Sequence, residues 1–187
     1  MAPISFKLGG GHGAPPRSLL NRARPIRLLL LDVDGVLTDG RIIYDADGRE
    51  LKAFHIHDGF GINQLRASGC LVGFLSGRAS AAVERRAKEL DVTIVYQGVD
   101  DKLPVYERIL SAHRLRDDEV AYVGDDLPDL PVLARAGLAV GVASAAPQVR
   151  RAVHWITSRA GGEGAVREVT DLLVLAGQLA PKRKRAV

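Results

Sequence analysis

Two aspartates one residue apart, Asp32 and Asp34, directly follow the four consecutive leucines Leu28–Leu31. An uninterrupted apolar run of this length predicts a strand buried on both faces of a parallel sheet. The acidic pair then lies at the carboxyl end of that strand, where open α/β sheets bind their ligands. Two carboxylates this close repel each other unless a cation compensates, and carboxylate oxygens suit a divalent metal such as Mg²⁺. The sequence therefore predicts a metal-dependent reaction centre at Asp32 and Asp34.

Other polar residues follow later predicted strands in the same way. Ser76, Gly77 and Arg78 follow the apolar run 71–75, and Asp125 follows the run 120–123. Lys102 opens a predicted helix after the strand predicted at 93–96. Because the carboxyl ends of parallel strands share one edge of a sheet, we expect these side chains to lie together.

This set of side chains suits phosphoryl transfer through an aspartyl-phosphate. A carboxylate nucleophile must approach an anionic phosphate, and Mg²⁺ together with Lys102 would remove that repulsion. Asp32 and Asp125 would share the Mg²⁺, which prefers carboxylates, waters and phosphate oxygens as ligands. Ser76 and the backbone N–H groups after it would hold the phosphate oxygens.

The elements that must position these residues alternate along the chain. Strands separated by helices of about ten residues predict an α/β fold, a three-layer Rossmann-like parallel sheet with helices on both faces. A hairpin with a turn at 45–48 should follow the first strand, its arms at 41–44 and 50–55. We expect strands at 28–31, 71–75, 93–96, 120–123, 138–142 and 153–156, and helices near 60–68, 79–90, 102–113, 128–136, 147–152 and 165–179.

Composition and charge predict one soluble domain without a nucleic-acid partner. The chain has 187 residues, 47% of them hydrophobic and 26% charged, which fits a single globular domain. Its net charge of +4 comes from the ends, since residues 1–27 and 176–187 contain nine cations and no acid. We expect a flexible extension at 1–24, the domain at 25–180 and a basic tail at 181–187. The tail lacks aromatic residues, so a solvated end is favoured over a nucleic-acid contact.

The single cysteine and the hydropathy pattern predict a cytoplasmic protein. Cys70 opens an apolar run, which favours a buried structural thiol over a nucleophile. No apolar stretch is long enough to span a bilayer, and the N-terminal region lacks the apolar segment of a secretory signal, so no membrane partner is expected.

The motif residues resemble those of the haloacid dehalogenase superfamily of phosphatases. The resemblance rests on Asp32-Val33-Asp34-Gly35-Val36, Ser76, Lys102 and Gly124-Asp125-Asp126, in that order. It implies that Asp32 is the nucleophile and Asp34 the general acid/base. It also implies that Asp32, the backbone carbonyl of Asp34 and the carboxylate of Asp125 hold the metal. Val36 departs from the threonine that many members carry there, which indicates a subfamily.

A narrower resemblance extends over residues 26–178. The segments 37–40, 58–61, 76–78, 122–129 and 159–168 are similar to those of the 3-deoxy-D-manno-octulosonate 8-phosphate (KDO 8-P) phosphatases, which hydrolyse a sugar-acid phosphate during lipopolysaccharide inner-core synthesis. The resemblance implies a capless core, a homotetramer and closure of each site by a neighbour's glycine-rich C-terminal segment. It adds Gly59, Arg78, Arg159 and Arg167 as substrate-binding candidates.

Several alternatives stay open at this stage. The catalytic motifs recognise phosphate, so a nine-carbon ulosonate 9-phosphate is an alternative substrate. A signalling receiver domain is disfavoured, because its phosphate-accepting aspartate follows a later strand, and a non-catalytic binding protein is the third alternative. Lys102 could be a solvated helix residue, and the acids at 125–129 could serve a helix N-terminus, with Asp129 only structural. His55 and His57 would share one face of a strand, and a polar rim is favoured there over a transition-metal site.

Overall fold

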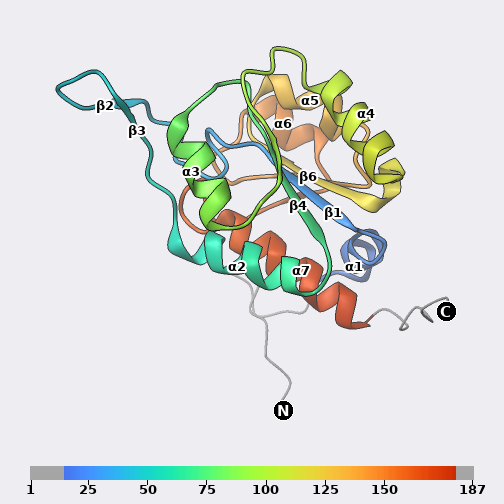
Figure 1. Ribbon diagram of the computed structural model, residues 1–187. Coiled ribbons are helices and arrows are strands. Elements are labelled where there is room, and N and C mark those ends of the chain that lie inside the picture. Colours follow the sequence, from blue (N-terminus) through green and yellow to red (C-terminus); the bar gives the residue numbers. More distant parts are fainter. Residues whose placement is uncertain (1–14, 180–187) are drawn as a thin grey trace.

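A six-stranded parallel sheet forms the centre of the molecule (Figure 1), in the strand order β5-β4-β1-β6-β7-β8. The computed structural model describes residues 15–179. The strands are β1 (Leu28–Leu31), β4 (Leu71–Leu75), β5 (Ile94–Tyr96), β6 (Val120–Gly124), β7 (Leu138–Gly141) and β8 (Trp155–Ile156). All four leucines of β1 are completely buried between β4 and β6, as the apolar run predicts. The predicted three-layer α/β fold is confirmed.

Helices cover both faces of this sheet (Figure 1). One face carries α1 (Arg17–Ala23), α2 (Ile56–Ala67) and α7 (Ala165–Leu179), and α3 (Ala81–Glu89) packs beside α2 through the contact of Gly59 with Arg86. The other face carries α4 (Lys102–His113), α5 (Leu130–Leu133) and α6 (Pro147–Ala152). The short 3₁₀ turns η1 (Asp117–Glu119) and η2 (Leu127–Asp129) flank β6. The region predicted as one helix at 128–136 is therefore η2 followed by the single turn α5.

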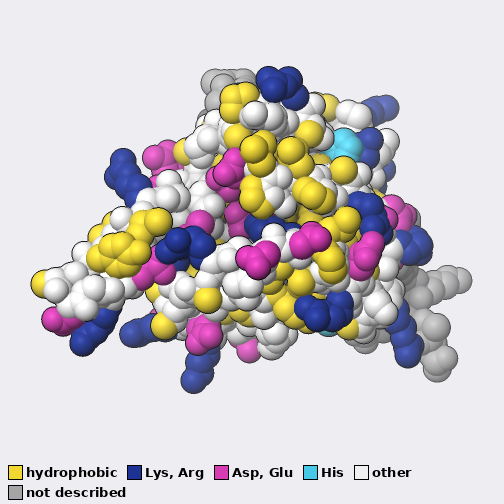
Figure 2. Space-filling model, turned by 90° about the horizontal axis from the view of Figure 1, so that it is seen from above, with side chains coloured by type: hydrophobic (Ala, Val, Ile, Leu, Met, Phe, Trp, Pro, Cys, Tyr) yellow, Lys and Arg dark blue, Asp and Glu magenta, His cyan; other side chains and the backbone are white. Residues whose placement is uncertain are grey.

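The predicted hairpin projects from the body as two short antiparallel strands, β2 (Ile43–Tyr44) and β3 (Glu50–Leu51). Its apolar side chains face outwards: Ile43 is 44% exposed and Tyr44 is 61% exposed. Figure 2 shows hydrophobic side chains gathered on this projecting arm. The hairpin thus forms no part of the core that the sheet and helices share.

Two local expectations were wrong, and a third holds in part. The predicted extension at 1–24 contains α1, whose Leu19 and Ala23 are buried because the helix packs against α7; residues 1–14 and the predicted tail 181–187 lie outside the described residues. His55 and His57 do not share a strand, because α2 begins at Ile56, and the Nδ1 atom of its N-cap His55 accepts the His57 N–H. Cys70 is only half-buried, although burial of its thiol raises its pKa to about 12, which fits an unreactive group.

No helix within residues 15–179 combines the length and the apolar character that a membrane crossing requires.

Candidate active site

The carboxyl ends of β1, β4 and β6 and the first residue of α4 surround a cavity of about 320 Å³. This is the edge at which the sequence predicts the chemistry. Seven predicted site residues line the cavity: Asp32, Asp34, Ser76, Gly77, Arg78, Lys102 and Asp125. Asp126 and Asp129 complete its acidic side. Three strand ends far apart in sequence therefore meet as expected from a parallel sheet.

A buried lysine lies between two carboxylates at the floor of this cavity. The Nζ atom of Lys102 is 2.8 Å from Oδ1 of Asp32 and 2.7 Å from Oδ1 of Asp129. Burial alone would lower the pKa of Lys102, but attraction to the two carboxylates outweighs burial and raises it. Lys102 is therefore a buried cation and not the solvated surface lysine that the sequence left possible.

Asp129 holds the surrounding groups in place. Its Oδ1 accepts hydrogen bonds from Lys102 and from the hydroxyl of the fully buried Tyr122, at 2.7 and 2.6 Å. Its Oδ2 accepts the backbone N–H groups of Asp125 and Asp126, at 2.9 and 3.3 Å. Both oxygens of Asp129 are thus used within the protein, so this carboxylate fixes Lys102 and the loop after β6.

Asp125 has an oxygen left for a ligand. Its Oδ1 is buried and has no hydrogen-bond partner among the described residues. Gly35, with a φ of +92°, lies directly beneath this carboxylate, and a Cβ there would be 2.0 Å from Oδ2 of Asp125. Only glycine permits that approach and that backbone conformation.

The carboxylates of Asp32, Asp125 and Asp129 offer oxygen atoms that all lie within 4.8 Å of one another. Hard oxygen donors at this density and the orphaned oxygen of Asp125 fit a divalent cation such as Mg²⁺. Because both oxygens of Asp129 are already engaged, Asp32 and Asp125 are the residues that would hold it. The metal predicted from the sequence therefore fits the residues present.

Burial and mutual repulsion disturb the titration of this cluster. Burial, followed by repulsion from Asp129, raises the pKa of Asp32 to about 6, although Lys102 opposes the shift. Burial, followed by repulsion from Asp32 and Asp129, raises the pKa of Asp125 to about 8. Such shifts are typical of acids assembled to share a cation.

The second aspartate of the pair contacts the hairpin. Lys52, which follows β3, forms an ion pair with Oδ1 of Asp34 and lies 3.5 Å from Oε1 of Glu50. Glu50 in turn accepts a hydrogen bond from Arg78, at 2.8 Å. The hairpin therefore supplies charges to the cavity, although its apolar side chains point to solvent.

Ser76 lies at the end of β4 and is buried. Its Oγ accepts the backbone N–H of Arg78 at 3.2 Å, which closes a tight turn after the strand. Because α3 begins only at Ala81, the backbone N–H groups next to Ser76 belong to this turn and not to a helix. A phosphate bound at Ser76 would therefore meet loop N–H groups.

A glycine-rich segment, residues 159–164, packs against the turn that carries Asp34. A Cβ on Gly161 would be 1.7 Å from the carbonyl oxygen of Gly35, and the N–H of Gly162 donates to the carbonyl of Val36 at 3.1 Å. The segment leads into α7, where Oδ1 of the buried Asp58 accepts the N–H of Arg167 at 2.7 Å. Asp58 thus caps the first turn of α7 from α2 and anchors the segment.

Three predicted substrate-binding residues, Gly59, Arg159 and Arg167, do not line the cavity. Gly59 lies in α2, where a Cβ would be 2.3 Å from Nη2 of Arg86. The side chain of Arg167 bonds Asp171 at 2.7 Å and stacks on Phe60. Arg159 is half-exposed and 3.9 Å from Glu168. Their substrate contacts stay predictions.

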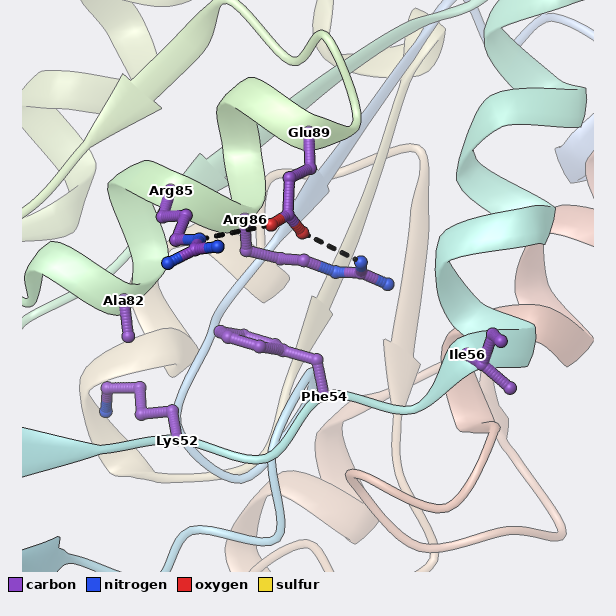
Figure 3. A pocket seen from close by; sticks show the side chains of 7 residues that line it. All are labelled: Lys52, Phe54, Ile56, Ala82, Arg85, Arg86 and Glu89. Carbon is purple, nitrogen blue, oxygen red and sulfur yellow. Dashed lines mark hydrogen bonds and ion pairs between the residues drawn. The ribbon is translucent and has the colours of Figure 1, made fainter.

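A second cavity, of about 490 Å³, lies between the segment after β3 and α3 (Figure 3). Phe54 lies under the guanidinium of Arg86, at 5.8 Å, and Glu89 bonds both Arg85 and Arg86. Lys52 contributes to the lining of this cavity while its ammonium group pairs with Asp34. Lys52 therefore borders this cavity and contacts Asp34, which lines the acidic one.

The sequence assigned no role to Lys52, Tyr122 or Asp58. Lys52 belongs to a segment considered only for its strand pattern. Tyr122 belongs to a segment that carries the family resemblance, but no spacing rule connects it to Asp129. Asp58 carried a local signal, since it is an acid in the first turn of a helix, but the helix start was placed four residues too late.

Comparison with known proteins agrees with this geometry. Residues 94–169 match a family model described as haloacid dehalogenase-like hydrolase. The 3-deoxy-D-manno-octulosonate 8-phosphate phosphatase KdsC of Yersinia pestis is 46% identical over 165 residues, which cover 88% of each chain. Segments beyond the family model are therefore also shared with a relative of similar length.

Solved structures have the same architecture. A probable YrbI family phosphatase from Pseudomonas syringae pv. phaseolica 1448a superposes with a TM-score of 0.85 at 49% identity, over 87% of this chain and 92% of that one. A KDO 8-P phosphatase from Moraxella catarrhalis, in complex with magnesium, phosphate and KDO, gives a TM-score of 0.85 at 41% identity, over 87% and 93%. With its fold, its acidic cavity and this identity over most of its length, the chain belongs to the KDO 8-P phosphatase family of haloacid dehalogenase-like hydrolases.

Proposed function

We propose that this chain is a Mg²⁺-dependent phosphomonoesterase that hydrolyses KDO 8-P to KDO and phosphate. The observation that carries the proposal is the buried Asp32–Lys102 pair beside the orphaned oxygen of Asp125, in a chain that is 46% identical to a KDO 8-P phosphatase. The Moraxella catarrhalis relative, with magnesium, phosphate and KDO bound, supports both the metal and the substrate.

The first half of the reaction uses Asp32 as the nucleophile. A carboxylate oxygen of Asp32 attacks phosphorus, the bond from phosphorus to the sugar oxygen breaks, and Asp34 gives that oxygen a proton. Lys102 holds Asp32 in place and supplies positive charge near the incoming phosphate. Bound Mg²⁺ would neutralise charge on the phosphoryl oxygens, with Asp32 and Asp125 as its carboxylate ligands.

The second half releases phosphate. Water attacks the phosphorus of the aspartyl-phosphate, Asp34 takes a proton from that water, and Asp32 leaves as a free carboxylate. Ser76 and the N–H groups of its turn would bind the phosphoryl oxygens throughout. With this substrate, the reaction belongs to lipopolysaccharide inner-core synthesis. The homotetramer, the site closure by a neighbouring subunit and the cytoplasmic location stay predictions.

A substrate panel tests the proposal. Phosphate release should be measured with KDO 8-P and with a nine-carbon ulosonate 9-phosphate, each with Mg²⁺ and with EDTA. We expect the higher kcat/KM with KDO 8-P and no turnover in EDTA. A higher kcat/KM with the nine-carbon substrate would assign the alternative, and absence of phosphate release from both would overturn the proposal.

A further inference from the structure

The turn that carries Asp34 is organised around one buried hydroxyl group, that of Thr38. The residue is only 2% exposed. Its Oγ1 accepts the backbone N–H of Gly35 at 3.3 Å and that of Gly40 at 3.2 Å, and it donates to the carbonyl of Val33 at 3.4 Å. A threonine hydroxyl has one donor and two acceptor positions, so all of its capacity is used inside this turn.

This hydroxyl restricts a backbone position that glycine leaves free. Residue 35 must be glycine, because its φ is +92° and a Cβ there would be 2.0 Å from Oδ2 of Asp125. Glycine adopts positive and negative φ about equally readily, so Gly35 does not itself determine which way the preceding peptide group faces. The hydrogen bond from its N–H to Thr38 does determine it.

The same peptide group contains the carbonyl of Asp34. This peptide bond is trans, and in a planar trans peptide the N–H and the C=O point in opposite directions. Because the N–H of Gly35 points to Oγ1 of Thr38, the carbonyl oxygen of Asp34 points away from it. Within residues 15–179, no backbone N–H donates to that carbonyl oxygen.

The free carbonyl belongs to the acidic cavity. Asp34 lines the cavity, and Gly35 lies beneath the carboxylate of Asp125, whose buried Oδ1 is also unpartnered among the described residues. Backbone carbonyls and carboxylates are both oxygen ligands for hard cations. A peptide group turned the other way would present an N–H, which repels a cation. The orientation of this one peptide group therefore bears on how tightly the cavity holds Mg²⁺.

We propose that Thr38 is a positioning residue for Mg²⁺ binding: its hydroxyl holds the N–H of Gly35 and so keeps the carbonyl oxygen of Asp34 available to the cation. Thr38 itself does not touch the cation and acts through the peptide group. The inference rests on the proposed function only for its metal ion and uses no property of the substrate.

Water cannot easily replace the hydroxyl if it is lost. The glycine-rich segment covers the turn from outside: a Cβ on Gly162 would be 2.7 Å from the carbonyl carbon of Thr38 and 2.6 Å from the N atom of Asp39. Removal of the hydroxyl therefore leaves buried N–H groups without a partner, and a peptide group that can turn over.

The test is the Kd for Mg²⁺ alone, measured by isothermal titration calorimetry on the full chain after removal of metal with EDTA. Thr38→Val has nearly the same shape without the hydroxyl. We expect its Kd to rise by about 10–100-fold, as loss of a group that orients a metal ligand does. Thr38→Ser keeps the hydroxyl and should keep the wild-type Kd. Thr38→Ala is a second variant without the hydroxyl, has no methyl group against the N–H groups, and should also raise the Kd.

Thr170→Val is the matched control. Thr170 is 1% exposed, and its hydroxyl donates to the carbonyl of Arg167 at 3.0 Å, in α7 and outside the acidic cavity. The variant loses a buried hydroxyl just as Thr38→Val does, so its Tm in EDTA should fall, but its Kd for Mg²⁺ should equal that of the wild type. Far-ultraviolet circular dichroism in EDTA shows which variants are folded when the Kd is measured.

Three results would overturn the inference. The first is a wild-type Kd in folded Thr38→Val or Thr38→Ala. The second is an equal rise in Thr38→Ser, which would exclude the hydroxyl as the cause. The third is an equal rise in Thr170→Val, which would show that the Kd follows general stability.

The proposed substrate can fail separately. If the wild type binds Mg²⁺ and the variants differ as expected, but KDO 8-P is not hydrolysed, the substrate is wrong and the role of Thr38 is supported. A wild-type chain that binds no Mg²⁺ would overturn both the metal dependence and the role of Thr38.

Discussion

The acidic cavity and the hairpin differ in how deeply their side chains are buried. At the ends of β1 and β6, Asp32, Lys102 and Asp129 are almost fully buried and compensate one another. On the hairpin, Ile43 and Tyr44 are exposed, whereas the side chain of Lys52, just after β3, is enclosed. The difference indicates that the sheet holds Asp32 and Lys102 within the core, whereas the hairpin contacts Asp34 from outside it.

The largest effect should come from the acidic cavity. Asp125→Asn removes a proposed carboxylate ligand of Mg²⁺. Loss of a residue that only supports a metal ligand can weaken metal binding by about 100-fold. We therefore expect the Mg²⁺ concentration for half-maximal activity to rise by more than about 100-fold. A Mg²⁺ titration of phosphatase activity measures this. Asp118→Asn, at an exposed acid of η1, is the control and should follow the wild-type curve. An unchanged titration for Asp125→Asn would remove Asp125 from the metal site.

The next effect should be on the free energy of unfolding, which should respond differently to substitutions in the sheet and in the hairpin. Leu30→Ala in β1 leaves a cavity in the fully buried core and should lower the free energy of unfolding by about 2–5 kcal/mol. Ile43→Ala on the hairpin should change it by less than about 0.5 kcal/mol in an isolated chain. Urea unfolding at several protein concentrations measures both. A large, concentration-dependent cost of Ile43→Ala would show instead that a second copy covers the hairpin, as the predicted homotetramer would.

The glycine-rich segment offers a matched pair of substitutions. Gly161→Ala forces a Cβ against the carbonyl of Gly35 and should cost about 1–3 kcal/mol, as overpacking does, while displacing the turn that carries Asp34. Gly177→Ala, in α7, meets nothing within 4 Å and should stabilise by about 0.5–1 kcal/mol. Urea unfolding and kcat are the measurements. Equal effects at both positions would refute the close approach of the segment to the Asp34 turn.

A further effect should be a pH dependence of the metal-free protein. The pKa of Asp125 is about 8 in the folded protein against an ordinary value of 3.8, so the folded state holds that proton more tightly. The resulting stabilisation is complete below pH 3.8 and is lost as the pH rises through about 8. In EDTA, the Tm of the wild type should therefore fall more between pH 5 and pH 8 than that of Asp125→Asn. Parallel pH profiles would contradict the shift.

The sequence predicted the parts of the site that come directly from strands. Four buried leucines ending at Asp32 are sufficient to place an acid at a sheet edge, and the same pattern located Ser76 and Asp125. The hairpin was expected, but the ion pair between Lys52 and Asp34 was not. This contact depends on how far the hairpin folds back towards β1, which no local pattern predicts. For Asp129, the sequence left open a purely structural role, and its hydrogen bonds to Lys102 and Tyr122 support that role.

The roles of the glycines were the hardest to predict from the sequence. The helix was expected to begin near residue 60, which leaves Gly59 outside it. The structure instead uses Gly59 within α2 to admit Arg86, a contact between two helices that no local pattern encodes. Gly161 likewise meets the turn after Gly35, more than a hundred residues earlier in the sequence.

The central claim is that Asp32 carries the phosphoryl group. Wild-type enzyme should be mixed with KDO 8-P and Mg²⁺, quenched in acid within the first turnover and digested for mass spectrometry. The account predicts one added phosphoryl group on the peptide that contains Asp32, and none in Asp32→Asn, which should also release no phosphate above background. A phosphorylated peptide elsewhere in the chain, or an Asp32→Asn variant as active as the wild type, would contradict it.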